Sequence, residues 1–291
     1  LQSTLDNYIS SLVLSQKAKE LGFDQFTDAE LAELQAQAQE EYDTQLESIR
    51  TTYFADSELE GDALTAEVTA YAKANGYTLD YQLDTAKSNK ISERLKASVT
   101  NTVTITDDDL QAALDKEVAS EKETFASTPA AYGTRVNAGT TVYYTPAGYR
   151  TIRVISVDKP TDEGASSDEA KQQIDALYLR LTAGEAFETL TEDVKTYAIC
   201  ADSTTPEADV VAAAMQLTDA LSYTEVLETE KAFYLAQLVE ELPEHTATLE
   251  EARATLYDAT LTDAQDTAYN ETVQGWINAA DVKTYTERLS D

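Results

Sequence analysis

A stretch rich in proline and glycine near the middle of the chain separates two parts with different patterns of apolar residues. Five residues that interrupt regular helices and strands lie within positions 127–150: Pro129, Gly133, Gly139, Pro146 and Gly148. Such a density indicates a boundary between folded parts. Apolar residues recur at helical spacing before it, and the short β-branched run TIRVISV follows directly after it. The chain is therefore expected to combine a helical region with an α+β region.

The part before this boundary predicts amphipathic helices that together fill roughly residues 1–125. In the first of them Leu5, Ile9, Leu12 and Val13 recur at helical spacing, and Gly22 stands where a left-handed C-terminal cap is needed. The second helix begins in FTDAEL and the last of this part begins in TITDDDL. Each of these segments is expected to bury one apolar face.

Capping patterns predict where several helices begin. Thr27 with Glu30, and Thr248 with Glu251, have the Thr-x-x-Glu spacing of a capping box, and Thr106 precedes another helical pattern. The helix that begins near Thr248 is the last of the chain and needs a partner for its apolar face. The N-terminal helices are the expected partner, so we predict a helical domain built from both ends of the chain.

The middle of the chain predicts a small α+β domain with the order β–α–α–α–β. Ser166 and Glu169 are expected to cap a helix that ends near Gly184, and a second helix is predicted from Phe187. VVAAAMQL predicts a further short helix, and AFYLAQLVEE predicts the closing strand.

These patterns predict a division into domains. Residues 1–126 and 246–291 form the helical domain, residues 127–146 a linker, and residues 147–245 the α+β domain.

The charge of the chain restricts its partners. With 54 acidic and 21 basic residues among 291, the formal net charge is −33, which repels nucleic acids and anionic membrane surfaces. A nucleic-acid partner is therefore not expected. The acidity fits a very soluble protein, and it also fits a surface for basic or unfolded polypeptide, so charge alone does not choose between them. No apolar run approaches the roughly 18 residues of a membrane span.

An acidic segment approximates a calcium-binding loop. Five residues fall on ligand or glycine positions of the EF-hand pattern: Asp56, Glu58, Glu60, Gly61 and Glu67. Glutamate is longer than the Asp or Asn usual at two of these positions, and Ala63 stands where a branched apolar residue is usual. An exposed loop between helices is therefore the preferred interpretation of residues 56–67.

Other chemically active residues are few. His245 is the only histidine and lies in a polar segment, and Cys200 is the only cysteine and is expected to be an ordinary buried thiol. No Cys/His cluster suggests zinc and no glycine-rich loop suggests a phosphate. We therefore expect no metal and no cofactor. The 17 tyrosines fit surface packing or contact with peptides.

The order of motifs along nearly the whole chain resembles the parvulin-type foldases of the SurA and PrsA class. YYTPAGYRTIRVISV is similar to the entry and first strand of a parvulin domain, and IDALYLRLTAGEAFETL to its helix and Gly-Glu turn. AAAMQL and YTEVLETEKAFYLAQLVEELPE are similar to its later helix, crossing loop and last strand. LDNYISSLVLSQKAKELGF and the tail from TLEEARATLYDATL to WINAADVKTYTERL resemble the helical chaperone domain.

The resemblance implies a fold, a location and partners. It implies an α+β chain in which a parvulin-like domain is inserted into an all-helical chaperone domain. It also implies an extracytoplasmic protein, secreted or on the cell surface, that binds unfolded or secreted client polypeptides. A homodimer and a lipid anchor attached to an upstream segment belong to the same expectation.

The resemblance also gives candidate site residues. In the parvulin family a histidine lies on the first strand and another on the last strand. Here Val154 occupies the first place, or Arg153 if the register shifts by one, and Tyr234 occupies the second. Val210 stands where an aromatic residue would wall the proline pocket, and Met215 is expected to keep one apolar wall. The candidate groove residues are therefore Arg153, Val154, Val210, Met215, Phe233 and Tyr234.

Three functions stay open at this stage. The first is a foldase or chaperone whose parvulin-like domain has weak or no isomerase activity, because both histidines and the family's glycine-rich middle segment are missing. The second is an active peptidyl-prolyl isomerase that uses the remaining pocket, so the sequence leaves open whether the chain is an enzyme. The third is a non-catalytic subunit that binds one specific partner.

Overall fold

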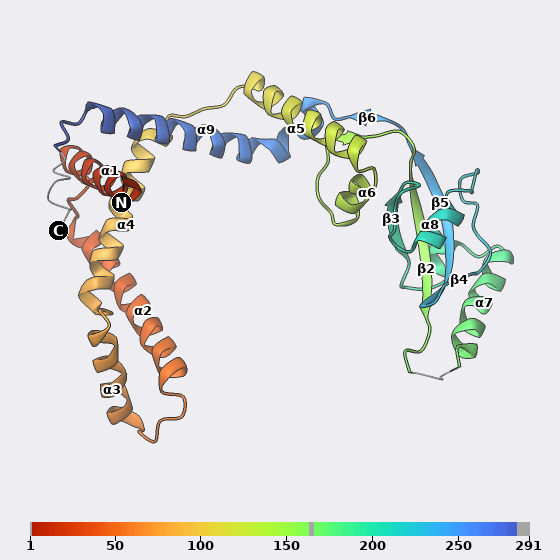
Figure 1. Cartoon of the computed structure of the whole chain (residues 1–291), viewed down its shortest axis with the longest axis horizontal. Helices are drawn as coiled ribbons and strands as arrows, with labels where there is room; N and C mark the ends of the chain where they lie inside the picture. The colour runs from red at the N-terminus through yellow and green to blue at the C-terminus, as the bar shows by residue number, and fades with distance from the viewer. Residues whose placement is uncertain (1, 163–165, 284–291) are drawn as a thin grey trace. The chain divides into compact units, whose positions relative to one another are not determined.

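The computed structural model describes residues 2–162 and 166–283 and has an α+β fold (Figure 1). The chain divides into two compact units, Leu1–Thr104 with Leu261–Asp291, and Ile105–Thr260. The first unit combines segments from both ends of the chain, and the second holds the β-sheet. The predicted fold class, helices from both ends with an inserted α+β region, is confirmed. The narrower domain boundaries stay predictions.

Helices from the N-terminal segment and the second part of the last helix form the first unit, which we call the helical unit. Their bounds are α1 Gln2–Glu20, α2 Asp28–Tyr53, α3 Gly61–Ala74, α4 Leu79–Thr100 and α9 Leu249–Ala279. α3 and α4 follow one another along α2, which packs against both (Figure 1). Apolar residues at helical spacing are buried there: Leu34, Ala38, Ile49, Leu64, Val68, Ala72 and Leu95.

Capping boxes fix the starts of α2 and α9, as the sequence predicted. The hydroxyl oxygen of Thr27 accepts the N–H of Glu30 at 3.3 Å, and the Glu30 carboxylate accepts the N–H of Thr27 at 2.8 Å. Thr248 and Glu251 make the same pair of bonds at 3.4 Å and 2.7 Å. Thr106 caps a further helix in the second unit. Each box satisfies N–H groups that would otherwise lack partners at a helix start.

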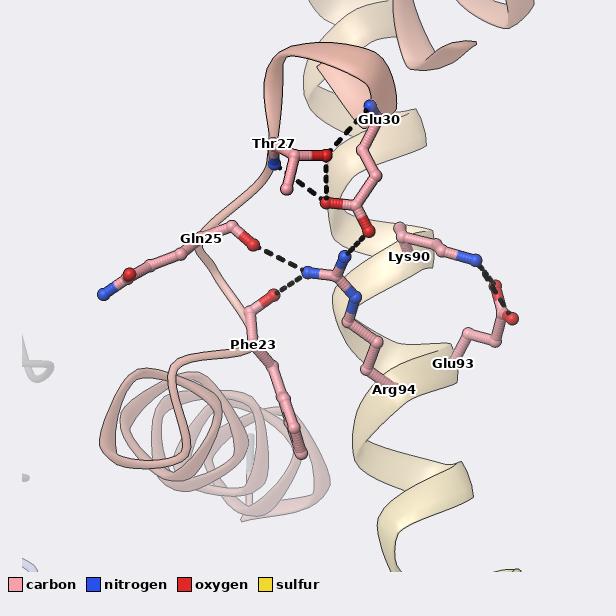
Figure 2. Close-up of polar contacts among 7 residues, drawn as sticks. All are labelled: Phe23, Gln25, Thr27, Glu30, Lys90, Glu93 and Arg94. Atoms are coloured by element: carbon pink, nitrogen blue, oxygen red, sulfur yellow. Dashed lines mark hydrogen bonds and ion pairs between the residues drawn. The ribbon is translucent and has the colours of Figure 1, made fainter.

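An arginine ties the turn between α1 and α2 to α4, as Figure 2 shows. Arg94 donates hydrogen bonds to the carbonyl oxygens of Phe23 at 3.0 Å and Gln25 at 2.8 Å, and it also pairs with the Glu30 carboxylate. The hydrogen bond from the Thr27 N–H and the bond from Arg94 lower the pKa of Glu30 to about 2. The same glutamate therefore serves both the cap of α2 and the contact with α4.

The second unit, which we call the sheet unit, is built on a four-stranded antiparallel sheet in the order β3-β2-β5-β4. The strands are β2 Tyr149–Asp158, β3 Lys195–Ile199, β4 Leu227–Glu228 and β5 Ala232–Leu242. Its helices are α5 Asp107–Ser127, α6 Ala130–Asn137, α7 Asp168–Thr182, α8 Ala208–Ala214 and the first part of α9. A separate pair joins β1 Tyr144–Thr145 to β6 His245–Thr246.

Successive residues of β2 and β5 point to opposite faces of the sheet, and a helix packs on each face. On the α8 side the buried core includes Ile152, Val154, Val210, Tyr234 and Ala236. On the α7 side it includes Ile155, Ile174, Phe187, Phe233 and Leu235. The predicted short helix VVAAAMQL and the predicted closing strand are confirmed as α8 and β5.

The prediction of a second helix after α7 is wrong. The segment from Phe187 forms only the short 3-10 turn η1, Phe187–Thr189. The strand β3, which the sequence analysis did not predict, then pairs with β2. Phe187 and Leu190 are buried in the α7-side core, so burial against the sheet decides the shape of this segment.

The predicted capping box of α7 is also wrong. α7 begins at Asp168, directly after Ser167, and Ser167 makes no side-chain cap bond. The hydroxyl oxygen of Ser166 accepts the N–H of Asp168 at 3.1 Å, so it acts two residues away and does not bond to Glu169. A serine can make this local turn bond as readily as a helix cap, so the spacing alone did not decide between them.

α6 covers the outer edge of the sheet at β3. The side-chain oxygen of Asn137 accepts the N–H of Ala198 at 2.7 Å, and its NH₂ group donates to the Ala198 carbonyl at 3.1 Å. Asn137 thus replaces a neighbouring strand at an edge that would otherwise expose unpaired backbone groups. Residues 127–146, predicted as a linker, contain α6 and β1. Gly133 permits the close approach, because a Cβ atom there would lie 2.5 Å from the Ala198 oxygen.

We expect Gly133→Ala to destabilise the protein and Gly275→Ala to stabilise it. Alanine favours a helix by about 1 kcal/mol over glycine, and a Cβ at Gly275 in α9 would meet no atom within 4 Å. At Gly133 the collision with backbone outweighs this gain by about 1–3 kcal/mol. Urea unfolding of both variants measures the two effects. Equal stabilities would contradict the close packing of α6 on β3.

A buried carboxylate holds the start of β1 against α5. One oxygen of Glu121 accepts the N–H groups of Tyr143 at 2.7 Å and Tyr144 at 2.8 Å, and Arg135 lies 3.5 Å from the other oxygen. The residue is only 2% exposed. Burial raises the pKa of Glu121 despite these partners. The charged form is therefore disfavoured in the folded protein relative to the unfolded chain.

This shift predicts a pH dependence of stability. Because the folded-state pKa of Glu121 is raised, its contribution is fully present below the unfolded value of 4.5 and is lost as the pH rises through the folded value. We expect the unfolding free energy of Glu121→Gln, relative to wild type, to increase as the pH rises from 4.5 toward neutrality. Urea unfolding at a series of pH values measures this, with the exposed Glu123→Gln as control. A difference that does not change with pH would refute the expectation.

Candidate functional site

A groove lies between α1 and the end of α9 in the helical unit, and apolar and charged residues line it together. Its cavity volume is about 520 Å³. The lining residues are Ile9, Leu12, Val13, Gln16, Lys17, Glu20, Trp276 and the segment 279–283. We call it the α1–α9 groove. Its size lies in the range of sites that bind small molecules or a few side chains.

The lining of the α1–α9 groove combines apolar side chains with charged ones. Ile9, Leu12 and Val13 come from one face of α1, as their helical spacing predicted, and Leu12 keeps 51% of its surface exposed. The Lys17 ammonium lies 5.8 Å from the centre of the Trp276 ring and 2.8 Å from the Glu20 carboxylate. Such a surface can take apolar side chains while its polar groups contact a peptide backbone.

The second candidate is the α8 face of the sheet, where the resemblance placed a proline pocket. Val154, Val210 and Tyr234 belong to one buried cluster there, and Met215 packs against it. Val154 is 3% exposed, Val210 0% and Tyr234 8%. The fold therefore brings these four candidate residues together, but it uses their side chains to fill the core.

The two other candidate residues lie on the opposite face. Phe233 is in the α7-side core and is 1% exposed, with the Lys159 ammonium 4.7 Å from its ring centre. Arg153 is next to Val154 in β2, and its side chain forms an ion pair with Glu188 at 3.2 Å. Neighbours in a strand point to opposite faces, so one groove cannot contain all six candidate residues.

The α8 face also lacks acid–base chemistry near neutral pH. Valine and methionine do not titrate, and burial, followed by the negative charge of Glu207, raises the pKa of Tyr234 to about 12. The phenol stays neutral far above physiological pH. What these residues can do is hold a shape and exclude water.

The remaining chemically active residues have ordinary surroundings. Cys200 is a buried free thiol, as predicted, and the hydroxyl of Ser203 donates to its sulfur at 3.6 Å. His245 is exposed on β6, and its Nε2 lies 3.3 Å from the Glu251 carboxylate, which the cap of α9 already uses. Neither residue lies in the α1–α9 groove or in the α8-side core.

The acidic segment 56–67 is not folded as a calcium loop. α3 begins at Gly61, so Asp62 and Glu67 lie on a helix rather than in a ligand-binding turn. Within residues 2–162 and 166–283 no group of three or more His, Cys, Asp or Glu side chains could hold a metal ion. The predicted exposed loop between helices is shorter than expected, because within this segment only residues 56–60 lie between α2 and α3 and residues 61–67 belong to α3.

Sequence reasoning missed two features. It named Ile9, Leu12 and Val13 as one helix face but did not predict that they line a groove together with Trp276, although the single tryptophan was an available signal. It also missed Gln237, which is buried in β5 and donates to the Leu221 carbonyl at 3.1 Å. The side-chain oxygen of Gln237 has no hydrogen-bond partner. Nothing in the sequence around Gln237 indicated this.

Comparisons with known proteins found solved structures of PrsA and of SurA-like proteins that are similar to this chain at low sequence identity. No family model matches the chain, and no curated protein matches it. PrsA from Bacillus subtilis is 16% identical over 99% of this chain and 87% of its own, with a TM-score of 0.27. Foldase protein PrsA from Streptococcus pneumoniae is 17% identical over 87% and 88%, with a TM-score of 0.24.

A third structure comes from Campylobacter jejuni, in work on PEB4 and the periplasmic protein Cj1289, described as SurA-like chaperones. It is 16% identical over 90% of this chain and 96% of its own, with a TM-score of 0.37. The chain thus resembles PrsA and SurA-like foldases at low sequence identity. No helix in the described parts of the chain is long and apolar enough to cross a membrane.

We expect Val154→Ala to destabilise the protein by about 2 kcal/mol, because it removes buried methyl groups and leaves a cavity. Leu179→Ala on α7, where the side chain is 68% exposed, is the control and should be nearly neutral. Urea unfolding measures both. If Val154 instead lined an open peptide site, truncation would change stability little and weaken peptide binding.

Proposed function

We propose that the chain is an extracytoplasmic protein-folding factor that binds unfolded polypeptide segments in the α1–α9 groove. We propose further that its parvulin-like part has weak or no prolyl isomerase activity and serves as a scaffold. The observation that carries the proposal is the groove itself, a cavity of about 520 Å³ whose lining includes Trp276 and the exposed Leu12.

The chemistry of the groove favours extended polypeptide over a small polar ligand. Ile9, Leu12 and Trp276 in its lining offer aliphatic and aromatic surface, against which apolar side chains of an unfolded chain would lose contact with water. Lys17 and Glu20 add both signs of charge to the lining, and this combination suits the polar groups of a peptide backbone better than a single ion. The net charge of −33 keeps such a protein soluble while it binds an aggregation-prone unfolded polypeptide.

We expect reduced isomerase activity because the side chains at the relevant positions are buried. Isomerisation of an X-Pro bond crosses a barrier of about 20 kcal/mol, and a catalyst needs an accessible, shaped pocket around the proline. At the positions of the family's histidines this chain has Val154 and Tyr234, which are buried in its own core. The resemblance to extracytoplasmic foldases is the basis for the location. The homodimer and the lipid anchor stay expectations of that resemblance.

Trp276 gives a direct test of peptide binding, because it is the only tryptophan and lines the groove. We expect its fluorescence to change when an unfolded, non-aggregating client is titrated, and aggregation of a model client to fall at stoichiometric amounts of the chain. Leu12→Ser should weaken both effects, since Leu12 is exposed in the groove. Leu179→Ser, at an exposed position on α7, is the matched control.

Three outcomes would count against the proposal. Unchanged Trp276 emission together with unchanged aggregation would reject a client-binding groove. If Leu12→Ser and Leu179→Ser had equal effects, the client would bind at a site other than the α1–α9 groove. Stable binding to a single copurifying protein, with no effect on unrelated clients, would favour a dedicated interaction subunit.

The isomerase question needs its own assay. We expect the cis–trans exchange rate of a proline-containing peptide, followed without a protease, to stay close to the rate in buffer. A large acceleration that Tyr234→Phe reduces would instead support an active enzyme.

A further inference from the structure

A group of aromatic side chains gathers where α2, α3 and α4 come together in the helical unit. The rings of Tyr53 and Tyr71 lie 4.9 Å apart between centres, and Phe54 meets Tyr71 edge-on at 5.8 Å. Tyr77 lies in the short link between α3 and α4 and is exposed, and burial is the largest cause that raises the pKa of Tyr71. We call Tyr53, Phe54, Tyr71 and Tyr77 the tyrosine cluster.

The tyrosine cluster is open to solvent. Tyr53 is 62% exposed and Tyr77 39%. Further large apolar side chains are exposed close to them in the sequence: Leu59, Leu79 and Tyr81. Single apolar residues on a surface need no explanation, but rings that touch one another and remain exposed mark a contact surface.

The segment beside the tyrosine cluster is acidic, with the exposed cations Arg50 and Lys73 at its two ends. Between Thr51 and Ala72 the chain has no lysine or arginine, and its acidic residues there are exposed: Asp56, Glu58, Glu60, Asp62 and Glu67. None of them forms one of the ion pairs found among the described residues. Their negative charge is therefore available to a partner. The surface thus combines exposed aromatic faces with an acidic border.

We propose that the tyrosine cluster is a second binding surface, which takes extended polypeptide segments carrying basic and aromatic side chains. Arginine and lysine contact the faces of tyrosine rings favourably and are attracted by the acidic border. Tyrosine gives large contact areas at low cost in side-chain entropy, which suits partners of varied sequence. The inference rests on the proposed function only in that both surfaces take polypeptide.

Other partners fit this surface less well. An anionic membrane or a nucleic acid would be repelled by the border from Asp56 to Glu67. A second copy of this chain would bring an identical acidic border against the first, which is unfavourable at low salt. A cationic, aromatic segment is the partner that both features attract.

The test uses the full chain and two labelled, unstructured peptides. One alternates arginine and phenylalanine with glycine and serine, and the other has glutamate in place of each arginine. We expect the first to bind measurably by fluorescence anisotropy, more weakly as salt is raised, and the second to bind far less. Tyr53→Ser combined with Tyr77→Ser should weaken binding of the first peptide about tenfold.

Matched variants make the result interpretable. Tyr257→Ser removes an exposed tyrosine of the sheet unit and should leave binding unchanged. Asp56→Asn with Glu58→Gln keeps the rings and should reduce the salt dependence, so the proposal does not depend on the fold of the double tyrosine variant. Circular dichroism checks that helix content is retained.

The outcomes separate this surface from the α1–α9 groove. Loss of binding in the tyrosine variant with an unchanged Trp276 response to client supports two surfaces. Equal binding of both peptides, or equal effects of the cluster variants and Tyr257→Ser, would overturn the inference while leaving the groove untouched. Self-association that the cluster variants abolish, with peptide binding unchanged, would assign the surface to a second copy and also overturn it.

Discussion

The sheet unit depends on a strand that is buried on both of its faces. β5 is buried from Ala232 to Leu238 and pairs with β2 along its whole length. A strand of this kind needs cover above and below, and α7 and α8 supply it. Val154 and Tyr234 lie in that same pairing and are buried in the core on the α8 side. The pairing that stabilises the sheet therefore also sets how little of these two side chains solvent can reach.

In the helical unit, unlike the sheet unit, some large apolar side chains remain exposed to solvent. Capping at Thr27 and the bonds of Arg94 fix the directions of α1, α2 and α4 through polar contacts near helix ends. Those contacts do not require every apolar side chain to be covered. Leu12 in the groove and Tyr53 in the tyrosine cluster stay open to solvent. A framework fixed by polar end contacts can carry open apolar surfaces without losing its shape, as a binder of unfolded chains requires.

The local and long-range parts of the fold were predictable to different degrees. The boxes at Thr27 and Thr248 were predicted because a cap involves residues three positions apart. The strand β3 and the turn η1 at Phe187 were missed, since both arise from contacts with β2 and the core of the sheet. The arrangement of the candidate site residues also depends on long-range contacts. The family pattern named Val154, or Arg153 if the register shifts by one, and the strand places the two side chains on opposite faces of the sheet.

The sequence by itself determined the starts of α2, α5 and α9, the α+β class and the strong negative charge, because each follows from local spacing or from composition. The union of the two chain ends was predicted because the last helix needed a partner for its apolar face. Only the tertiary structure decided which apolar side chains remain exposed to solvent. Val154 and Leu12 look equally apolar in the sequence, yet β5 and α8 bury Val154 whereas Leu12 keeps 51% of its surface exposed. Burial depends on residues far away along the chain, so exposure, and with it the choice of binding surface, is a property of the fold.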